Sequence, residues 1–349
     1  MADKKGYKCP SCGGAMQFDP ASQKLKCPFC GSTFEPAEYD AQNKTEDSGA
    51  PGTEWSLNAD DMQVFSCNNC GGEVIGDENT GALTCPYCDE PLVLNERFSG
   101  SLKPEFVLPF KVDKTAARNA YADYVSKKKL LPAIFKNDKH ISDIKGVYVP
   151  FWLFDASAKA SAEFEGTKET KQGEDTKIEY FSVKRSGDMS FKAIPVDAST
   201  RMEDDLMDSI EPFDAKELKP FTPAYLAGFM ADKYDVSKEE CEKRADKRIK
   251  NSAVDVLRES AAGDYTTLKT VSSNVTIPSI SAHYALYPVW VLSTKWNGSI
   301  YRFAMNGQTG KFIGNLPVDK GAYRSKLIVT GIISTVVVFA LLLAYWFFK

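Results

Sequence analysis

The chain has 349 residues, of which 43% are hydrophobic and 26% charged, so most of it is expected to be globular and a largely disordered protein is excluded. Its net charge of −4 is unevenly distributed, because residues 1–99 hold seven Lys and Arg against sixteen Asp and Glu, a balance of −9, whereas the remainder carries +5. Nucleic-acid backbones are bound through Lys and Arg, so the acidic part argues against that function class.

The spacing C-x2-C-x14-C-x2-C occurs twice near the N-terminus. Four thiolates in two close pairs suit the tetrahedral coordination of structural Zn²⁺, which leaves no ligand position open. We therefore predict two structural zinc ions, held by zinc ribbons over residues 1–38 and 63–98. The predicted metal ligands are Cys9, Cys12, Cys27 and Cys30 in the first ribbon, and Cys67, Cys70, Cys85 and Cys88 in the second.

Glycine follows the second cysteine of three C-x-x-C pairs, and Asp89 follows that of the fourth. A tight turn with positive φ is expected at these positions, so that backbone N–H groups point at the sulfurs. Turn residues at 19–23 and 77–81 separate short alternating runs, which predicts a β-hairpin in each ribbon. Each unit is too small to fold alone, so the metal must supply much of its folding free energy. The three glycines are Gly13, Gly31 and Gly71.

Two other uses of the cysteines stay open, namely disulfide bonds and a redox C-x-x-C role. Residues 1–8 contain no apolar run, so no signal peptide is predicted and a reducing compartment is favoured over disulfides. A redox role would need one reactive pair, whereas the chain has four. Residues 39–62 are polar and rich in turn formers, which predicts a linker that leaves the two ribbons independent.

Residues 99–320 have the pattern of a mixed α+β domain. Strands are predicted over 109–112, 150–154 and 288–292, each with proline in first position, where no ladder hydrogen bond is lost. The last two share P-x-W-x-[FL], which is compatible with an internal duplication.

A meander is predicted after the third of these strands, over 299–313, with a turn at Asn306-Gly307. Helices are predicted over 113–129 and from the capping box Ser237–Glu240 to about Ser260. The mixture of separated strands and helices predicts an α+β fold class.

Residues 327–348 run without one charge, which is long enough to cross a bilayer core of roughly 30 Å as a helix. Aromatic residues crowd its far end at 345–348, as at a membrane interface, and three basic residues precede it. This predicts a tail-anchored, single-pass protein of the cell membrane, with its N-terminal bulk in the cytoplasm. The basic residues are Lys320, Arg324 and Lys326.

No catalytic constellation is predicted. His140 and His283 are the only histidines, and Cys241, the ninth cysteine, is expected to be a small buried residue in a helix. The acidic run 203–205 is expected to be a solvated helix face. Gly76-x4-Gly81 continues without the Lys-Ser/Thr of a phosphate loop. An enzyme with a polar pocket around Trp152 and Trp290 stays open as an alternative.

The acidic ribbons suit protein partners, and a mildly basic domain suits an anionic cytoplasmic leaflet. These features favour a membrane-anchored adaptor over a tethered nucleic-acid-binding protein. Phe29 and Tyr87 occupy matching positions within the two ribbons and are predicted as exposed anchors for a partner, with core packing as the alternative.

Five stretches resemble a bacterial family of membrane-anchored proteins with paired transcription-factor-IIB-type zinc ribbons. This family is often misnamed after the primosomal replication helicase, a label that the missing phosphate loop contradicts. The resemblance implies a complex that recruits a phage-shock A-type membrane-remodelling protein and a flotillin-like protein. The matching stretches are Tyr148-Val-Pro-Phe-Trp152, Glu211-Pro-Phe-Asp214, Tyr225-Leu-Ala-Gly-Phe229, Tyr284-Ala-Leu-Tyr-Pro-Val-Trp290 and Met305-Asn-Gly-Gln-Thr-Gly-Lys311.

Overall fold

The structure is a computed structural model that describes residues 7–43, 51–53, 63–76, 84–88, 93–95, 102–141 and 143–347. Its strands are β1 (Gln17–Asp19), β2 (Lys24–Lys26), β3 (Thr33–Phe34), β4 (Gln63–Ser66), β5 (Glu73–Gly76), β6 (Val93–Asn95), β7 (Phe106–Val107), β8 (Lys145–Gln172), β9 (Asp175–Asp197), β10 (Lys219–Pro220), β11 (Met230–Asp232), β12 (Thr267–Trp296), β13 (Ser299–Asn306) and β14 (Phe312–Gly314). Its helices are α1 (Pro36–Asn43), α2 (Lys114–Ser126), α3 (Asp138–Ile141), α4 (Asp204–Ile210), α5 (Lys238–Ala262) and α6 (Lys320–Phe347), with 3₁₀ turns η1 (Ala133–Lys136), η2 (Ala215–Glu217) and η3 (Pro223–Leu226). The predicted α+β fold class is confirmed.

A single large sheet organises the body of the molecule. In the part of the chain that the structure describes, its path is β10-β7-β12-β8-β11-β5-β4-β6, with β9 beside β8 and the hairpin β13–β14 beside β12. The strands β1, β2 and β3 form a separate small sheet in the first ribbon. The second ribbon therefore belongs to the large sheet, because β5 pairs with β11 through Ile75 and Val74.

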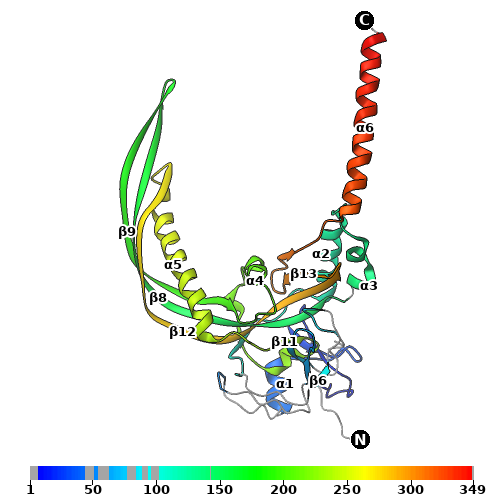
Figure 1. Ribbon diagram of the computed structural model, residues 1–349. Helices are drawn as coiled ribbons and strands as arrows, with labels where there is room; N and C mark the ends of the chain where they lie inside the picture. The colour runs from blue at the N-terminus through cyan, green and yellow to red at the C-terminus, as the bar shows by residue number, and fades with distance from the viewer. Residues whose placement is uncertain are drawn as a thin grey trace.

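Three very long strands carry the sheet beyond the body as a curved arm. The hairpin β8–β9 and the first half of β12 form the arm, and α5 lies along its inner side (Figure 1). Small residues of the strands and of α5 are buried between the two layers, which allows the helix to lie close to the sheet. The buried residues of this layer are Ala160, Ala162, Phe164, Val183, Ala253, Leu257 and Ala261. Register shifts, for example between Thr276 and Ser279, accompany the curvature.

The prolines of the two P-x-W segments lie inside β8 and β12, so the predicted first-position placement is wrong. β8 pairs with β11 before Pro150 and with β9 after it, while β12 pairs with β7 before Pro288 and with β13 after it. The carbonyls of Pro150 and Pro288 accept from Ala198 and Gly307 on that same side. Each proline therefore falls where one neighbouring strand replaces another, and its missing N–H costs no ladder hydrogen bond.

The two segments also pair with each other. Pro288 lies opposite Tyr148, and Leu286 lies opposite Pro150, in an antiparallel register. Adding 138 to the residue numbers of the first segment gives those of the second. Exchanging the two segments therefore leaves this pairing unchanged, as rotation about a local twofold axis would. The arrangement is compatible with an internal duplication.

The helix predictions are confirmed, and one strand prediction is not. Asp113 caps α2 by accepting from Ala116 N, and Ser237 and Glu240 form the capping box of α5. Residues 109–112 are not a strand; the N–H groups of Lys111 and Val112 both donate to the Gly307 carbonyl instead. The predicted meander forms as β12, β13 and β14.

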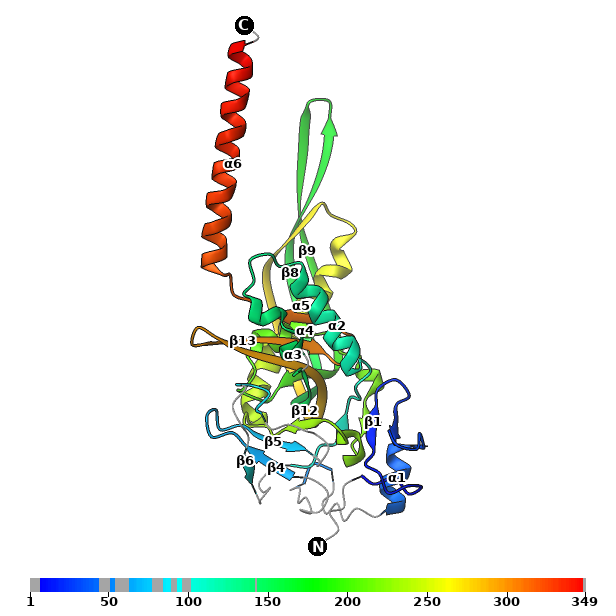
Figure 2. The same ribbon diagram turned by 90° about the vertical axis from the view of Figure 1, so that its right-hand side faces the viewer.

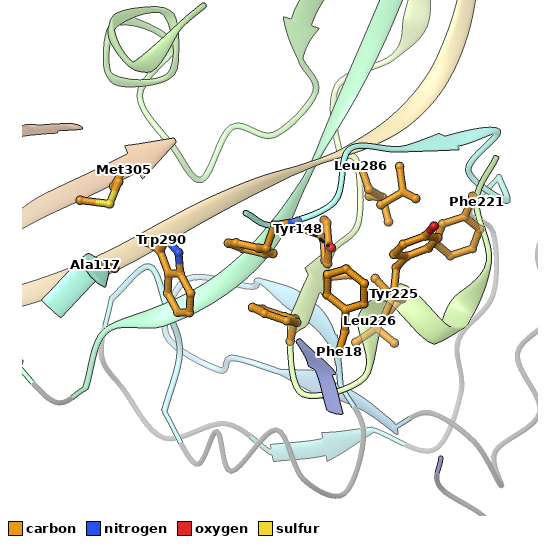
Figure 3. Packing of buried hydrophobic residues seen from close by; sticks show 14 of the residues in the cluster. Phe18, Ala117, Tyr148, Phe221, Tyr225, Leu226, Leu286, Trp290 and Met305 are labelled. Atoms are coloured by element: carbon orange, nitrogen blue, oxygen red, sulfur yellow. Dashed lines mark hydrogen bonds between the residues drawn. The ribbon is translucent and has the colours of Figure 1, made fainter. Parts of the chain in front are cut away.

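The ribbons are not independent of the domain, which corrects the expectation drawn from residues 39–62. The first five of those residues complete α1, whose Asp40 accepts from Ala224 N at 3.1 Å. Phe18 N of the first ribbon donates to the Ala227 carbonyl at 3.0 Å. Figure 3 shows Phe18 among Tyr148, Tyr225 and Leu226, in the core of the domain. Much of the predicted linker lies outside the described residues.

The C-terminal helix α6 stands away from the body. None of its described residues is buried, and among the described helices it is the one long and apolar enough to cross a membrane. Its start is fixed by Asp319, whose backbone N–H donates to the Leu130 carbonyl and whose carboxylate caps Gly321 and Ala322. Figures 1 and 2 show α6 and the arm rising from the same end of the body, away from α1.

Candidate metal centres

The structure brings the eight predicted ligands together as two groups of four. Within each group all four Sγ atoms lie within 4.8 Å of one another. The first group has Cys9 Sγ 3.5 Å from Cys30 Sγ and Cys12 Sγ 3.5 Å from Cys27 Sγ. The second group repeats this arrangement with separations of 3.5 Å for Cys67–Cys88 and 3.7 Å for Cys70–Cys85.

These separations fit a tetrahedral thiolate site. Zn–S bonds of about 2.3 Å at the tetrahedral angle place neighbouring sulfurs about 3.8 Å apart. The two groups need only a small expansion to reach that value. All nine cysteines of the chain are free thiols, so no disulfide competes for the ligands. Both groups could bind a metal ion, and four thiolates in this arrangement suit Zn²⁺.

In three of the four pairs the local fold is a tight turn closed by backbone hydrogen bonds. Cys9 N donates to the Gly14 carbonyl and Gly13 N donates back to the Cys9 carbonyl; Cys67, Gly71 and Gly72 repeat the pattern at 2.8 Å. The predicted positive φ is found at all three glycines, with values of 71°, 77° and 71°. Burial raises the pKa of the Cys9 thiol, but the backbone N–H groups of Ser11 and Cys12 favour the thiolate, and the pKa is lowered overall. The expectation for Asp89 lies outside the described residues.

The two centres differ in their surroundings. In the first, Cys12 and Cys30 are exposed, and the Phe29 ring lies over Gly14 with 77% of its surface accessible. In the second, only Cys70 is exposed, and Tyr87 is 1% exposed. The prediction of an exposed aromatic anchor therefore fails for Tyr87, although it sits at the position equivalent to Phe29.

Tertiary contacts of the second centre explain this burial. Ser293 on β12 donates to the Pro86 carbonyl at 2.7 Å, and Arg302 on β13 donates to the Tyr87 carbonyl at 3.1 Å. Lys145 at the start of β8 donates to Thr84. The peptide between Cys85 and Cys88 is therefore held on the large sheet, and its aromatic side chain fills the core.

Arg201 lies beside the second metal centre, and no sequence pattern indicated this. A Cβ at Gly72 would lie 3.1 Å from Arg201 Nε and 3.4 Å from Cys70 Sγ, so the guanidinium lies beside the ligand turn. Arg201 also pairs with the buried Asp232 at 2.9 Å. Burial raises the pKa of Asp232 to about 6, while Arg201 and the Ser199 hydroxyl oppose that shift. The arginine places positive charge where a zinc thiolate centre would carry −2.

The other residues considered for chemistry stay apart. His140 Nε2 contacts Thr294 Oγ1 at 2.6 Å, and His283 Nδ1 contacts Glu105 at 2.9 Å. Cys241 is buried on α5, where its thiol donates to the Asp197 carbonyl at 3.5 Å. No nucleophile pair forms between that thiol and either histidine among these contacts.

The acidic run at 203–205 is exposed at the start of α4, as expected for a solvated helix face. Asp204, at the start of α4, pairs with Arg244 of α5 at 3.0 Å. The same arginine pairs with Asp197 at 3.0 Å and with Asp208 at 3.5 Å. Asp204 therefore belongs to an ion-pair network that connects α4 to α5.

Comparison with known proteins gives one relative. The chain is 34% identical over 319 residues to "Uncharacterized protein YdjG" of Bacillus subtilis (strain 168), which covers 90% of this chain and 91% of that protein. No family model matches the sequence, and no solved structure matches the fold. With this identity over nearly the whole length of both proteins, and with two tetracysteine clusters consistent with zinc ribbons, the chain belongs to the YdjG family.

Proposed function

We propose that this protein is a non-enzymatic adaptor that binds two zinc ions, is anchored in the cell membrane by α6, and recruits cytosolic proteins to the bilayer. The observation that carries the proposal is the exposure of α6. Leu327, Ile333 and Leu341 are each about 60% exposed on a helix of about 42 Å. Such a surface is stable in a hydrocarbon core rather than in water. The basic residues before the apolar stretch favour a cytoplasmic body.

The metal centres support an architectural role. Four thiolates complete the coordination of zinc and leave no position for a substrate or an activated water. Residues 1–99, which contain both ribbons and the segment between them, carry a balance of −9, and two zinc thiolate centres would lower it to about −13. This charge favours protein partners over nucleic acid. Phe29, exposed on the first centre, is the proposed contact for a partner.

The proposed partners follow from the family resemblance. A phage-shock A-type membrane-remodelling protein and a flotillin-like protein are the two candidates, which would place the adaptor in envelope-stress or membrane-maintenance complexes. The position of the ribbons supports such an arrangement, because they lie at the end of the body opposite α6 (Figure 2). A partner bound there would be held at the membrane without entering it.

A pull-down from solubilised membranes tests the proposal with two matched variants. Phe29→Ala removes an exposed aromatic from the first ribbon, and Tyr180→Ala removes one of 68% exposure from the arm. We expect loss of the phage-shock A-type protein with Phe29→Ala only, at unchanged zinc content. Equal recovery from both variants would refute the proposed contact, and retention of DNA or RNA instead of protein would favour the nucleic-acid alternative.

A further inference from the structure

Basic residues gather around the base of α6. The Asp319 N–H group donates to the Leu130 carbonyl at 2.8 Å, so the start of α6 lies against the segment that follows α2 (Figure 1). Segments 127–139 and 318–326 meet at this contact and form what we call the anchor-base surface. They hold eight basic residues against two acidic ones, Asp138 and Asp319. The basic residues are Lys127, Lys128, Lys129, Lys136, Lys139, Lys320, Arg324 and Lys326.

The anchor-base surface accounts for the whole positive excess of the α+β domain and α6. Residues 100–349 carry a balance of +5, whereas the two segments alone carry +6, so the rest of this part of the chain is nearly neutral. The positive charge is therefore concentrated beside the apolar helix instead of being spread over the domain. A concentrated field of this kind attracts anionic partners to one place.

The lysines of this surface face solvent. Lys128, Lys129 and Lys136 are exposed, and within the described residues the last two form no ion pair. Lys127 pairs with Asp123 at 2.6 Å, but both side chains are at least 66% exposed, and ion pairs of this kind contribute little to stability. Most of the positive charge is therefore available to a partner outside the chain.

Exposed apolar side chains lie among these charges. The strand β14 reaches the end of α2, where the Phe312 ring lies 5.2 Å from the Tyr124 ring. Basic and apolar residues side by side are typical of surfaces that lie in a bilayer interface, because lysines reach the headgroups while apolar side chains enter the acyl boundary. The exposed apolar residues near the base of α6 are Ile134, Phe312, Ile313, Val318 and Tyr323.

The length of α6 before its apolar part brings this surface close to the headgroups. The uncharged run begins at Leu327, which is about 12 Å beyond Asp319 at the rise of an α-helix. The headgroup layer occupies about 5 to 7 Å of that distance, and electrostatic attraction extends over about 8 Å in physiological salt. Because the surface adjoins the base of α6, it stays near the bilayer when the helix tilts.

We propose that the anchor-base surface binds anionic phospholipid headgroups in the leaflet around α6. Lys128, Lys129 and Lys136 contact the headgroups, and Ile134 enters the interface beside them. The bound lipids hold the body against the membrane, so that its orientation depends on the charge of the leaflet. This inference rests on the proposed membrane anchor and adds the class of lipid that the protein recognises.

Acetylation of lysines in the full-length protein tests the proposal in two kinds of lipid nanodisc. One kind contains only phosphatidylcholine, and the other also contains phosphatidylglycerol. Mass spectrometry gives the acetylation rate of each lysine. We expect phosphatidylglycerol to slow acetylation of Lys128, Lys129 and Lys136 at least about fivefold, the effect typical of one basic residue at an anionic leaflet. Lys243 and Lys247, exposed on α5, should change by less than about twofold.

Equal acetylation rates of the first three lysines in the two kinds of disc would overturn the proposal. Failure of the protein to enter discs would contradict both the proposed anchor and this inference. Rapid acetylation of these lysines in a protein held by discs with phosphatidylglycerol would contradict this inference alone.

Two double variants locate the binding through the lipid content of purified discs. Discs that hold the unmodified protein should contain a larger share of phosphatidylglycerol than empty discs assembled from the same mixture. Lys129→Gln with Lys136→Gln should reduce this enrichment by at least about half. Lys243→Gln with Lys247→Gln removes the same charge from α5 and should leave the enrichment unchanged. Equal losses in the two double variants would assign the effect to net charge and refute the surface.

Discussion

Tyr87 and Phe29 occupy equivalent positions in the two metal centres, and the structure predicts opposite consequences for their removal. Tyr87→Ala empties a site that is 1% exposed, at the contact between the second ribbon and the large sheet. Truncation of a buried aromatic residue to alanine costs about 3 to 5 kcal/mol. Phe29→Ala removes a ring that is 77% exposed, and surface substitutions usually change stability by about 0.5 kcal/mol or less.

The two variants are compared by thermal unfolding of the zinc-loaded protein lacking residues 320–349. A loss of about 4 kcal/mol corresponds to a fall in Tm of roughly 6 °C for a body of this size, against less than about 1 °C for Phe29→Ala. Because Tyr87 belongs to the core of the large sheet, the whole transition should shift rather than a separate early step. An unchanged Tm in Tyr87→Ala, or a small independent transition, would refute the integration of the second ribbon into the domain.

Four further predictions concern the core, the charges, the metal and the anchor. Gly146→Ala should lower Tm, because its Cβ would meet Phe229 at 2.5 Å, whereas Gly187→Ala, with no atom within 4 Å, should not. Burial raises the pKa of Asp197 to about 6, although the charge of Arg244 opposes this shift. The folded state therefore binds a proton that the unfolded chain releases, so the contribution of Asp197 to the free energy of unfolding rises as pH falls from 7 to 5. In denaturant titrations at pH 7 and pH 5, Asp197→Asn should remove about 1 kcal/mol of this rise in the free energy of unfolding. The same pH dependence in the variant and in the unmodified protein would contradict the prediction. Cys67→Ser should reduce zinc from two ions to one per chain by elemental analysis and also lower the Tm of the domain; two ions in the variant would contradict the ligand set. Deletion of residues 320–349 should move the protein from the membrane to the soluble fraction, and continued sedimentation with membranes would assign attachment to another surface.

The metal centres were predictable because coordination chemistry fixes the spacing of their ligands. Two C-x-x-C pairs across a hairpin can meet at one tetrahedral ion with little dependence on the rest of the fold. The capping box at Ser237 and the uncharged run from residue 327 are equally local signals, and both correspond to helices in the structure. In each case the physical cause lies within a few residues of the pattern.

Features decided by tertiary contacts were not predictable in this way. The same position in two ribbons is exposed as Phe29 and buried as Tyr87, because only the second ribbon joins the large sheet. Arg201 lies beside the second centre without any sequence signal. The length of β8 and β12 was also missed, since the buried positions in the outer half of β8 are mostly alanine and the outer half of β12 has no fully buried position.

Recruitment of a phage-shock A-type protein to vesicles tests the adaptor proposal most directly. The full-length protein is reconstituted in phosphatidylcholine vesicles with its ribbons outward, and the purified partner is measured in the floated fraction. We expect the amount of partner in the floated fraction to rise in proportion to the reconstituted protein. Phe29→Ala should abolish this binding while the variant still holds two zinc ions per chain. Equal flotation of the partner with protein-free vesicles and with reconstituted vesicles would contradict it.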